Sequence, residues 1–494
     1  MTPTPTPQQA AFIEALVTTT SNIALVARAG TGKTTTILQG VAAYHAAHPN
    51  HEIVVCAFNK AIADEVKEKL VKAGYPWQKV QGSTIHSLGF GLVKFVFKSK
   101  VDANKVRDMI RARNEPIYQQ YGAQISDLVR YAKGAGFGFF DAIGDNAAWY
   151  ALADHYDVNG LDDTSEMDAI VAAAQDIYRA SLAHTDVVDF DDMILFPLVK
   201  NLRVKFTKDL IILDEAQDLS KARQALARKF LKPGTGRMIV VGDDRQAIYG
   251  FSGADAQALE NLTNELNAVT LPLTVTWRCP KAVIREAQKI VADIECATDN
   301  EGEVTRVEEL PADLLATDAI LCRNTAPLVT IAYSLIRKGV ACKVEGRAIG
   351  DGLLRLVDRW KVSSVDQFIR KLEDYRQREI QKAMAKNNEA KVEEINDRVE
   401  TLLQVCLAVT AKGQHSLTAV RDFINNLFSD DVRGVLTLAT YHRSKGREWN
   451  RVFLWEHATR CPSRAAKQEW QKLQEQNLAY VAITRSKNIL TFVN

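Results

Sequence analysis

The chain has 494 residues, of which 47% are hydrophobic and 25% are charged, and its formal net charge is +2. This length exceeds what one hydrophobic core serves, so we expect several domains of ordinary globular composition. The near-neutral charge excludes a globally basic nucleic-acid binder, so any such role must depend on a local patch or groove.

Seven cysteines are spread along the chain without a C-x-x-C pair. This spacing argues against a zinc site, an iron–sulfur cluster or a disulfide framework, and it fits a reducing cytosol. No uninterrupted apolar run reaches membrane-spanning length, and the N-terminus has no signal-peptide pattern. We therefore expect a cytoplasmic protein with no membrane partner.

The first strong motif follows a predicted strand at residues 23–27. Gly30 and Gly32 interrupt the apolar run, and Lys33 and Thr34 open a helix-compatible segment. This order of strand, glycine-rich loop and helix is typical of a phosphate-binding loop. Backbone N–H groups and the helix dipole face the anion, Lys33 supplies a point charge, and the Thr34 hydroxyl is placed to bind Mg²⁺. The motif predicts a site for a nucleoside triphosphate.

Acidic clusters follow two later strands of the same predicted sheet. A strand at residues 53–58 leads into a helix, which indicates a parallel α/β arrangement, and further strands follow at residues 210–213 and 238–241. Ligands of open α/β sheets bind at the carboxyl ends of the strands. We therefore expect Asp214 to hold Mg²⁺ through the water shell of the metal, and Glu215 to orient and deprotonate an attacking water.

Helical periodicity replaces the strand signal between about residues 88 and 184, which indicates a helical insertion. Charge is uneven there: residues 94–133 carry nine basic and four acidic side chains, whereas residues 134–184 carry one basic and nine acidic side chains. Two differently solvated faces explain this pattern as well as a basic face along a phosphate backbone does. The sequence leaves both explanations open.

A second α/β unit begins near residue 271, and a second run of helical periodicity, typical of a solvated helical hairpin, interrupts it. The predicted fold class is therefore α/β, with two parallel-sheet lobes that each carry a mainly helical insertion. The predicted domains are a first lobe at 1–88 and 185–270, its insertion at 89–184, a second lobe at 271–350 and 432–494, and its short insertion at 351–431.

The ordered motifs resemble those of the superfamily 1 helicases of the UvrD/Rep-like group, in a compact form and across both lobes. The loop at residues 29–34 is similar to the loop of that family, which also tolerates alanine at the first-glycine position, here Ala27. Residues 214–218 are similar to motif II, and residues 242–254 to motif III. The resemblance implies two RecA-like lobes. Segments similar to motifs Ia, Ib, IV, V and VI lie at residues 58–61, 84–87, 277–280, 440–449 and 478–487.

The resemblance also implies roles in binding and hydrolysing ATP with Mg²⁺. Gln8 is similar to the adenine-reading glutamine, Glu448 to a ribose contact and Tyr480 to a residue that stacks on the base. Gln246 is similar to the γ-phosphate sensor, and Arg485 to the arginine finger. The predicted catalytic residues are Lys33, Glu215, Gln246, Arg278 and Arg485. The predicted ATP-binding residues are Gln8, Ala29, Gly30, Thr31, Gly32, Lys33, Thr34, Thr35, Arg278, Glu448, Tyr480 and Arg485, and the predicted metal ligands are Thr34 and Asp214.

Contacts with single-stranded DNA follow from the same resemblance. Aromatic side chains that stack on bases work with any sequence, which suits a motor. The predicted DNA-binding residues are Phe58, Asn59, Lys60, Thr84, His86, Tyr249, Phe251, Thr440 and His442.

The activity that the resemblance implies is an ATP-dependent DNA helicase and translocase that moves 3′ to 5′ on single-stranded DNA. Hydrolysis in a cleft between the lobes would drive strand separation, with single strands and single-strand/duplex junctions as partners in replication or repair. The implied setting is bacterial or phage-encoded and nucleoid-associated, and we expect no fused nuclease. Three alternatives stay open: a translocase that displaces proteins without processive unwinding, an RNA-directed helicase, and a plain nucleotide-binding switch.

Overall fold

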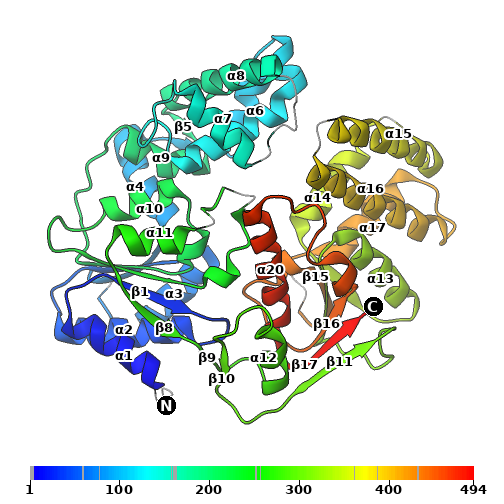
Figure 1. Ribbon diagram of the computed structural model, residues 1–494. Helices are drawn as coiled ribbons and strands as arrows, with labels where there is room; N and C mark the ends of the chain where they lie inside the picture. The colour runs from blue at the N-terminus through cyan, green and yellow to red at the C-terminus, as the bar shows by residue number, and fades with distance from the viewer. Residues whose placement is uncertain are drawn as a thin grey trace. The chain divides into compact units, whose positions relative to one another are not determined.

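The computed structural model describes residues 5–57, 60–76, 78–156, 158, 164–250, 253–255, 257–360, 362–385, 388–430 and 433–494. Phe58, Asn59 and Phe251, which the sequence predicts to contact DNA, lie outside these residues. The chain divides into two compact units, Met1–Thr274 and Val275–Asn494. Each unit is described by itself, and Figure 1 traces both along the chain.

Unit 1 is built on a six-stranded sheet with the strand order β3-β2-β6-β7-β1-β8, and every neighbouring pair is parallel. The inner strands are short, almost wholly buried apolar runs, as expected of a parallel sheet that helices cover on both faces. The strands are β1 (Ile23–Ala27), β2 (Ile53–Ala57), β3 (Val80–Thr84), β6 (Leu210–Leu213), β7 (Arg237–Gly242) and β8 (Val269–Leu273).

Helices cover the two faces of this sheet, and each face has its own apolar core (Figure 1). One core contains Phe12 and Leu16 of the first helix, and the other contains Leu226 and Leu262. The helices of the first face are α1 (Pro7–Thr18), α2 (Lys33–Ala47) and α3 (Lys60–Lys72), and those of the second are α4 (Ile85–Phe97), α9 (Phe190–Val199), α10 (Lys221–Lys229) and α11 (Ala258–Glu265).

The segment between α4 and α9 is mainly helical and has a separate core around the fully buried Trp149 and Tyr178. Its helices are α5 (Lys105–Arg111), α6 (Pro116–Ala135), α7 (Asn146–His155) and α8 (Thr164–Ala183). A parallel pair of two-residue strands, β4 (Lys100–Val101) and β5 (Val187–Val188), closes its base, which the sequence pattern does not predict.

Part of the uneven charge of this segment is neutralised inside it. Lys105 and Lys133 are buried, and each forms an ion pair with Asp192, at 2.7 Å. Lys133 also pairs with Asp189 at 2.6 Å, and Arg113 pairs with Asp176. Because buried charges must be paired, these contacts join α5 and α6 to α9. Lys105 and Lys133 therefore do not belong to a basic surface.

Unit 2 is built on a seven-stranded parallel sheet with the order β11-β17-β16-β12-β15-β13-β14. A separate parallel pair, β9 and β10, precedes it. The strands are β9 (Val275–Thr276), β10 (Glu295–Cys296), β11 (Glu303–Val307), β12 (Ala319–Cys322), β13 (Cys342–Glu345), β14 (Phe428–Ser429), β15 (Leu436–Thr440), β16 (Trp449–Trp455) and β17 (Ser486–Val493).

The helices of unit 2 include a long hairpin of α15 (Val365–Met384) and α16 (Glu389–Thr410). The predicted periodic residues of α16, such as Val399 and Leu402, are fully buried in a core that is continuous with the sheet, so the hairpin packs on the lobe. Asp397 of α16 accepts hydrogen bonds from the N–H groups of Thr325 and Ala326 at the start of α13 (Thr325–Arg337). The other helices are α12 (Lys281–Ala287), α13 (Thr325–Arg337), α14 (Arg347–Val357), α17 (Leu417–Leu427), α18 (Tyr441–Ser444), α19 (His457–Arg460) and α20 (Glu469–Ile483).

The predicted fold class is confirmed: both units are α/β with parallel sheets, an architecture consistent with two RecA-like lobes. The division of each lobe into core and insertion stays a prediction, and α14 runs across the boundary predicted at 350/351. All seven cysteines are free thiols. None of the helices in the described part of the chain is both long and apolar enough to cross a bilayer.

Candidate functional site

The phosphate-binding loop lies between β1 and α2. Gly30 and Gly32 adopt φ values of 74° and 79°, a left-handed conformation that favours glycine, and Gly32 is the N-cap of α2. A side chain at Gly32 would also meet the amide nitrogen of Gln9 at 3.2 Å. Lys33 and Thr34 therefore begin a helix whose first N–H groups and positive dipole end suit an anion.

Two carboxylates at the end of β6 face this loop. The Nζ atom of Lys33 lies 2.9 Å from Oε1 of Glu215, and Asp214 precedes Glu215 at the strand end. Glu215 itself has a φ of 53°, a left-handed conformation that is costly for a non-glycine residue and is typical of functional sites. This conformation accompanies the turn from β6 into the 3₁₀ helix η1 (Ala216–Asp218).

The charged groups of the phosphate loop and of the end of β6 shift the pKa values of one another. Burial alone would lower the pKa of Lys33, but Glu215, Asp214 and Asp243 raise it above the ordinary lysine value, so the ammonium stays charged. Burial, followed by the charge of Glu215, raises the pKa of Asp214 to about 6. A buried acid with a raised pKa beside a second carboxylate is a place where added positive charge is favourable. Mg²⁺ is commonly held by one or two carboxylates and substrate phosphates, so Asp214 and the Thr34 hydroxyl fit that ion.

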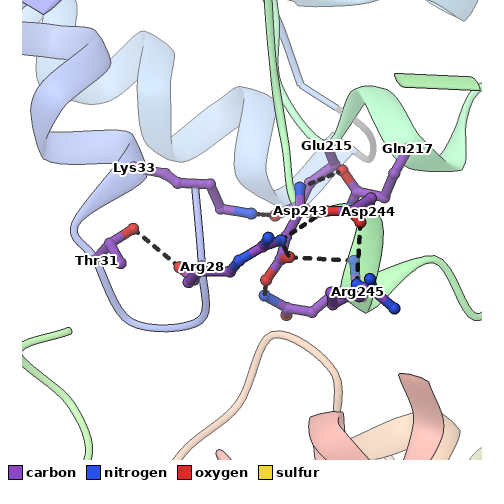
Figure 2. A network of polar contacts seen from close by, with 9 residues as sticks. Arg28, Thr31, Lys33, Glu215, Gln217, Asp243, Asp244 and Arg245 are labelled. Carbon is purple, nitrogen blue, oxygen red and sulfur yellow. Dashed lines mark hydrogen bonds and ion pairs between the residues drawn. The ribbon is translucent and has the colours of Figure 1, made fainter. Parts of the chain in front are cut away.

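The turn after β7 adds a second polar cluster, which Figure 2 shows together with the loop. Asp243 is fully buried, and its Oδ2 atom accepts a hydrogen bond of 2.6 Å from the side-chain amide of Gln246. The N–H group of Asp243 donates to Oε1 of Gln217, whose amide nitrogen in turn donates to Glu215. The predicted residues Gln246 and Glu215 are thus joined through two residues that the sequence did not single out.

The two glutamines at the start of α1 have different partners. The side chain of Gln8 bonds to the backbone N–H and the hydroxyl of Thr274. Its neighbour Gln9 is buried, donates to the carbonyl oxygen of Thr31 in the phosphate loop, and forms a capping box with Thr6. The T-x-x-Q spacing of the capping box is the sequence signal that points to Gln9. The adenine contact of Gln8 stays a prediction.

In unit 2 the segments that resemble motifs IV, V and VI come together. The Nε atom of Arg278 donates to Glu448 at 2.7 Å, and Nη1 of Arg278 reaches the carbonyl oxygen of Thr484 at 3.4 Å. Arg485 is 1% exposed and donates to the carbonyl oxygens of Val481 and Arg447. Burial raises the pKa of Glu448, but Arg278 and then Lys487 lower it below the ordinary value. The structure thus brings Arg278, Glu448 and the backbone of motif VI into one cluster.

The base contact predicted for Tyr480 stays a prediction, although this side chain is buried. Tyr480 lies on α20 with 0% of its surface exposed, so its ring is not available to a ligand in this conformation. The indole of Trp277, directly before Arg278, is 53% exposed. An exposed aromatic ring beside a cluster of arginines is the better candidate for stacking on a base, and its place in the motif IV segment is the signal that the sequence offered.

The described residues predicted to contact DNA fall into two groups. Thr84 and Thr440 are nearly buried, and each caps a helix by accepting a hydrogen bond from a backbone N–H group of α4 or α18. Burial, followed by the charge of a nearby arginine, lowers the pKa of His86 to about 4 and that of His442 to about 3. At neutral pH both imidazoles are therefore uncharged. Of the remaining residues, Lys60 is exposed and Tyr249 is partly buried.

Comparison with known proteins finds two family models that match the chain. Residues 6–267 match the model of the UvrD/REP helicase N-terminal domain, and residues 355–494 match the UvrD-like helicase C-terminal domain.

Relatives with similar sequences include three bacterial proteins. The chain is 24% identical over 416 residues to the ATP-dependent DNA helicase UvrD1 of Mycobacterium tuberculosis (strain ATCC 25618 / H37Rv), a match that covers 73% of this chain and 52% of that protein. It is 25% identical over 301 residues to the ATP-dependent DNA helicase Rep of Escherichia coli (strain K12), a match that covers 54% of this chain and 41% of that protein. It is 26% identical over 308 residues to the ATP-dependent DNA helicase PcrA of Staphylococcus aureus (strain Mu50 / ATCC 700699), a match that covers 56% of this chain and 39% of that protein. The chain thus spans about half or less of the length of these relatives.

Proposed function

Since the chain belongs to the UvrD/Rep helicase family, we propose that it hydrolyses ATP in response to single-stranded DNA and moves along that strand, 3′ to 5′, separating duplexes. The observation that carries the proposal is the cluster at the carboxyl edge of the first sheet. There Lys33 pairs with Glu215, next to Asp214 and beside the start of α2, and Gln246 is joined to Glu215 through Asp243 and Gln217. The names of relatives as ATP-dependent DNA helicases support the substrate class.

The residues of unit 1 have distinct parts in the proposed reaction. Lys33 and the first N–H groups of α2 bind the phosphates, and Lys33 exchanges its contact with Glu215 for a phosphate oxygen. Thr34 and Asp214 would hold Mg²⁺, which when bound would neutralise part of the negative charge on the phosphates. Glu215, released from Lys33, orients the attacking water and accepts its proton. Gln246 remains positioned by Asp243 to sense the γ-phosphate.

The arginines of unit 2 supply the second part of the proposal. We assign Arg278 and Arg485 to the same γ-phosphate, on the basis of their motifs, because charge developing on a transferred phosphoryl group is stabilised by guanidinium groups. Their grouping with Glu448 and Thr484 within one unit supports a common task. Hydrolysis would then change the γ-phosphate contacts of both units. Movement along a strand requires such a change in both.

Contacts with the strand are proposed for the family motifs that border it. Lys60 is exposed at the start of α3, where its charge can reach a phosphate. His86 and His442 would act as neutral rings because their pKa values lie near 4 and 3. Thr84 and Thr440 place the first turns of α4 and α18 through their capping hydrogen bonds.

The test is an unwinding assay with ATP and Mg²⁺ on 3′-tailed, 5′-tailed and blunt duplexes of the same sequence. We expect rapid unwinding of the 3′-tailed duplex alone, and none by Lys33→Ala. Unwinding only from the 5′ tail would contradict the polarity. Displacement of a bound protein from a 3′-tailed strand without unwinding would favour the protein-stripping translocase, and stronger activation by RNA than by DNA would favour the RNA-directed helicase.

A further inference from the structure

Arg28 lies inside the phosphate loop, one residue after β1, and its side chain points across to the turn after β7 (Figure 2). The residue is 8% exposed. Its Nη1 atom lies 3.0 Å from Oδ1 of Asp243 and 2.5 Å from Oδ1 of Asp244. Its carbonyl oxygen accepts from the hydroxyl of Thr31 at 2.9 Å, so both ends of Arg28 hold part of the site.

Asp243 connects this arginine to the predicted catalytic residues. One carboxylate oxygen of Asp243 accepts from Arg28, and the other accepts from the side-chain amide of Gln246. The backbone N–H group of Asp243 donates to Gln217, which donates to Glu215. A continuous path of hydrogen bonds and ion pairs thus runs from the phosphate loop to the sensor and to the water-activating carboxylate.

The burial of Asp243 makes its partner important. Burial raises the pKa of this carboxyl group, and the charges of Arg28 and Lys33 oppose that rise. A buried carboxylate that loses a charged partner is left strongly destabilised and shifts its position or its protonation. The planar fork of arginine can engage two carboxylates in fixed geometry, which the point charge of lysine does not reproduce. Gln246 depends on the same carboxylate, so a change at Arg28 reaches it through Asp243.

We propose that Arg28 is a positioning residue for ATP hydrolysis. It fixes the carboxylate of Asp243, and through Asp243 it holds the side chain of Gln246 in place relative to the phosphate loop. The inference rests on the proposed ATPase function and adds a residue that the motif resemblance did not single out. Arg28 does not contact the reacting atoms in this account. Its removal should slow turnover rather than weaken ATP binding, because Lys33 and the amides of α2 remain in place.

The experiment measures kcat and KM for ATP, with saturating single-stranded DNA, in Arg28→Gln, Arg28→Lys, Gln246→Ala and the double variant Arg28→Gln/Gln246→Ala. We expect kcat of Arg28→Gln to fall at least tenfold with KM changed by less than threefold, and Arg28→Lys to recover part of the loss. If Arg28 acts through Gln246, the double variant turns over within twofold of Gln246→Ala alone. Multiplication of the two losses, or a wild-type kcat for Arg28→Gln, would overturn the proposal.

A matched control is available in the same unit. Lys208 is also buried and forms an ion pair of 2.9 Å with Glu52, ahead of β6 and β2. Lys208→Gln should lower the melting temperature but leave kcat within twofold of wild type. A loss of kcat in Lys208→Gln equal to that in Arg28→Gln would show a general effect of removing a buried ion pair and would overturn the specific role.

Folding of the variants is checked by thermal melting. If Arg28→Gln does not fold, the pair Arg28→Gln/Asp243→Asn replaces it, because it leaves no uncompensated buried charge. The account expects this pair to have the kcat of Asp243→Asn alone, and a further drop would overturn it. A wild-type protein without DNA-stimulated hydrolysis would refute the proposed function instead, so the two failures are distinguishable.

Discussion

The candidate nucleotide cluster of unit 1 and the arginine cluster of unit 2 are held together in different ways. In unit 1, charged side chains fix one another: Lys33 pairs with Glu215, and Arg28 pairs with Asp243. In unit 2, Arg485 is held by carbonyl oxygens of the preceding helix α20 and of the loop before β16. Changes in unit 1 should therefore alter stability and chemistry together, whereas changes to the unit 2 arginine should act mainly on chemistry.

The largest effect is expected from Arg485→Gln. An arginine that stabilises a transferring phosphoryl group contributes roughly 10³- to 10⁵-fold to kcat, so we expect a loss of at least roughly 10³-fold. Steady-state hydrolysis with saturating single-stranded DNA measures the loss, and a melting curve gives the accompanying change in stability. If activity falls only in proportion to the folded fraction, the comparison between the clusters breaks down.

A smaller loss of kcat, together with a gain in stability, is expected from Glu215→Gln. General-base catalysis contributes roughly 10²- to 10⁴-fold, so kcat should fall in that range. The substitution removes the neighbouring charge that helps to raise the pKa of Asp214, so the melting temperature should rise. Binding of a fluorescent ATP analogue should survive. A marked drop in the melting temperature would show that the Lys33 pair outweighs the repulsion between the carboxylates.

Trp277→Ala sharpens the assignment of the base contact in unit 2. Stacking of aromatic rings contributes about 0.5–1.5 kcal/mol, so KM for ATP should rise about twofold to tenfold, with a smaller change in kcat. Tyr480→Phe is the control, since the buried ring is kept, and its KM should match that of wild type. An unchanged KM in Trp277→Ala would contradict the assignment of Trp277 as the stacking residue.

The smallest effect concerns acid stability. The pKa of His442 is lowered from 6.5 to about 3, by burial first and then by Arg323. The unfolded chain therefore binds a proton that the folded protein does not, and stability is lost as pH falls below about 6.5 towards 3. Between pH 6.5 and 5.5 this residue should account for about 1 kcal/mol, and His442→Asn should lose that much less in urea unfolding. Equal losses in both proteins would contradict the low pKa.

The sequence predicted the parts of the fold that depend on local pattern. Short apolar runs followed by glycine or acidic residues predicted β1, β6 and β7. The carboxyl ends of these strands share one edge, and this predicted that Lys33, Asp214 and Glu215 lie close together. Parallel sheets require these ends to lie on one edge, so the grouping followed from pattern alone.

What escaped prediction depends on partners that are distant in the chain. The ion pair of Arg28 is one example, because its partner Asp243 follows 215 residues later. Lys133 looks like part of a basic stretch, but it is buried against Asp189 and Asp192. Tyr480 belongs to a motif, but its burial depends on the packing of surrounding residues, which the motif does not specify. Local spacing cannot show which side chains are brought together by the rest of the fold.

The central claim is that the cluster at Lys33 hydrolyses ATP in response to a polynucleotide. The direct measurement is the ATP hydrolysis rate of the purified protein with Mg²⁺, with and without a single-stranded oligonucleotide, set beside Lys33→Ala. We expect a rate that rises at least tenfold with the oligonucleotide and is absent in the folded Lys33→Ala variant. A rate that does not respond to the oligonucleotide, or that persists in Lys33→Ala, would contradict it.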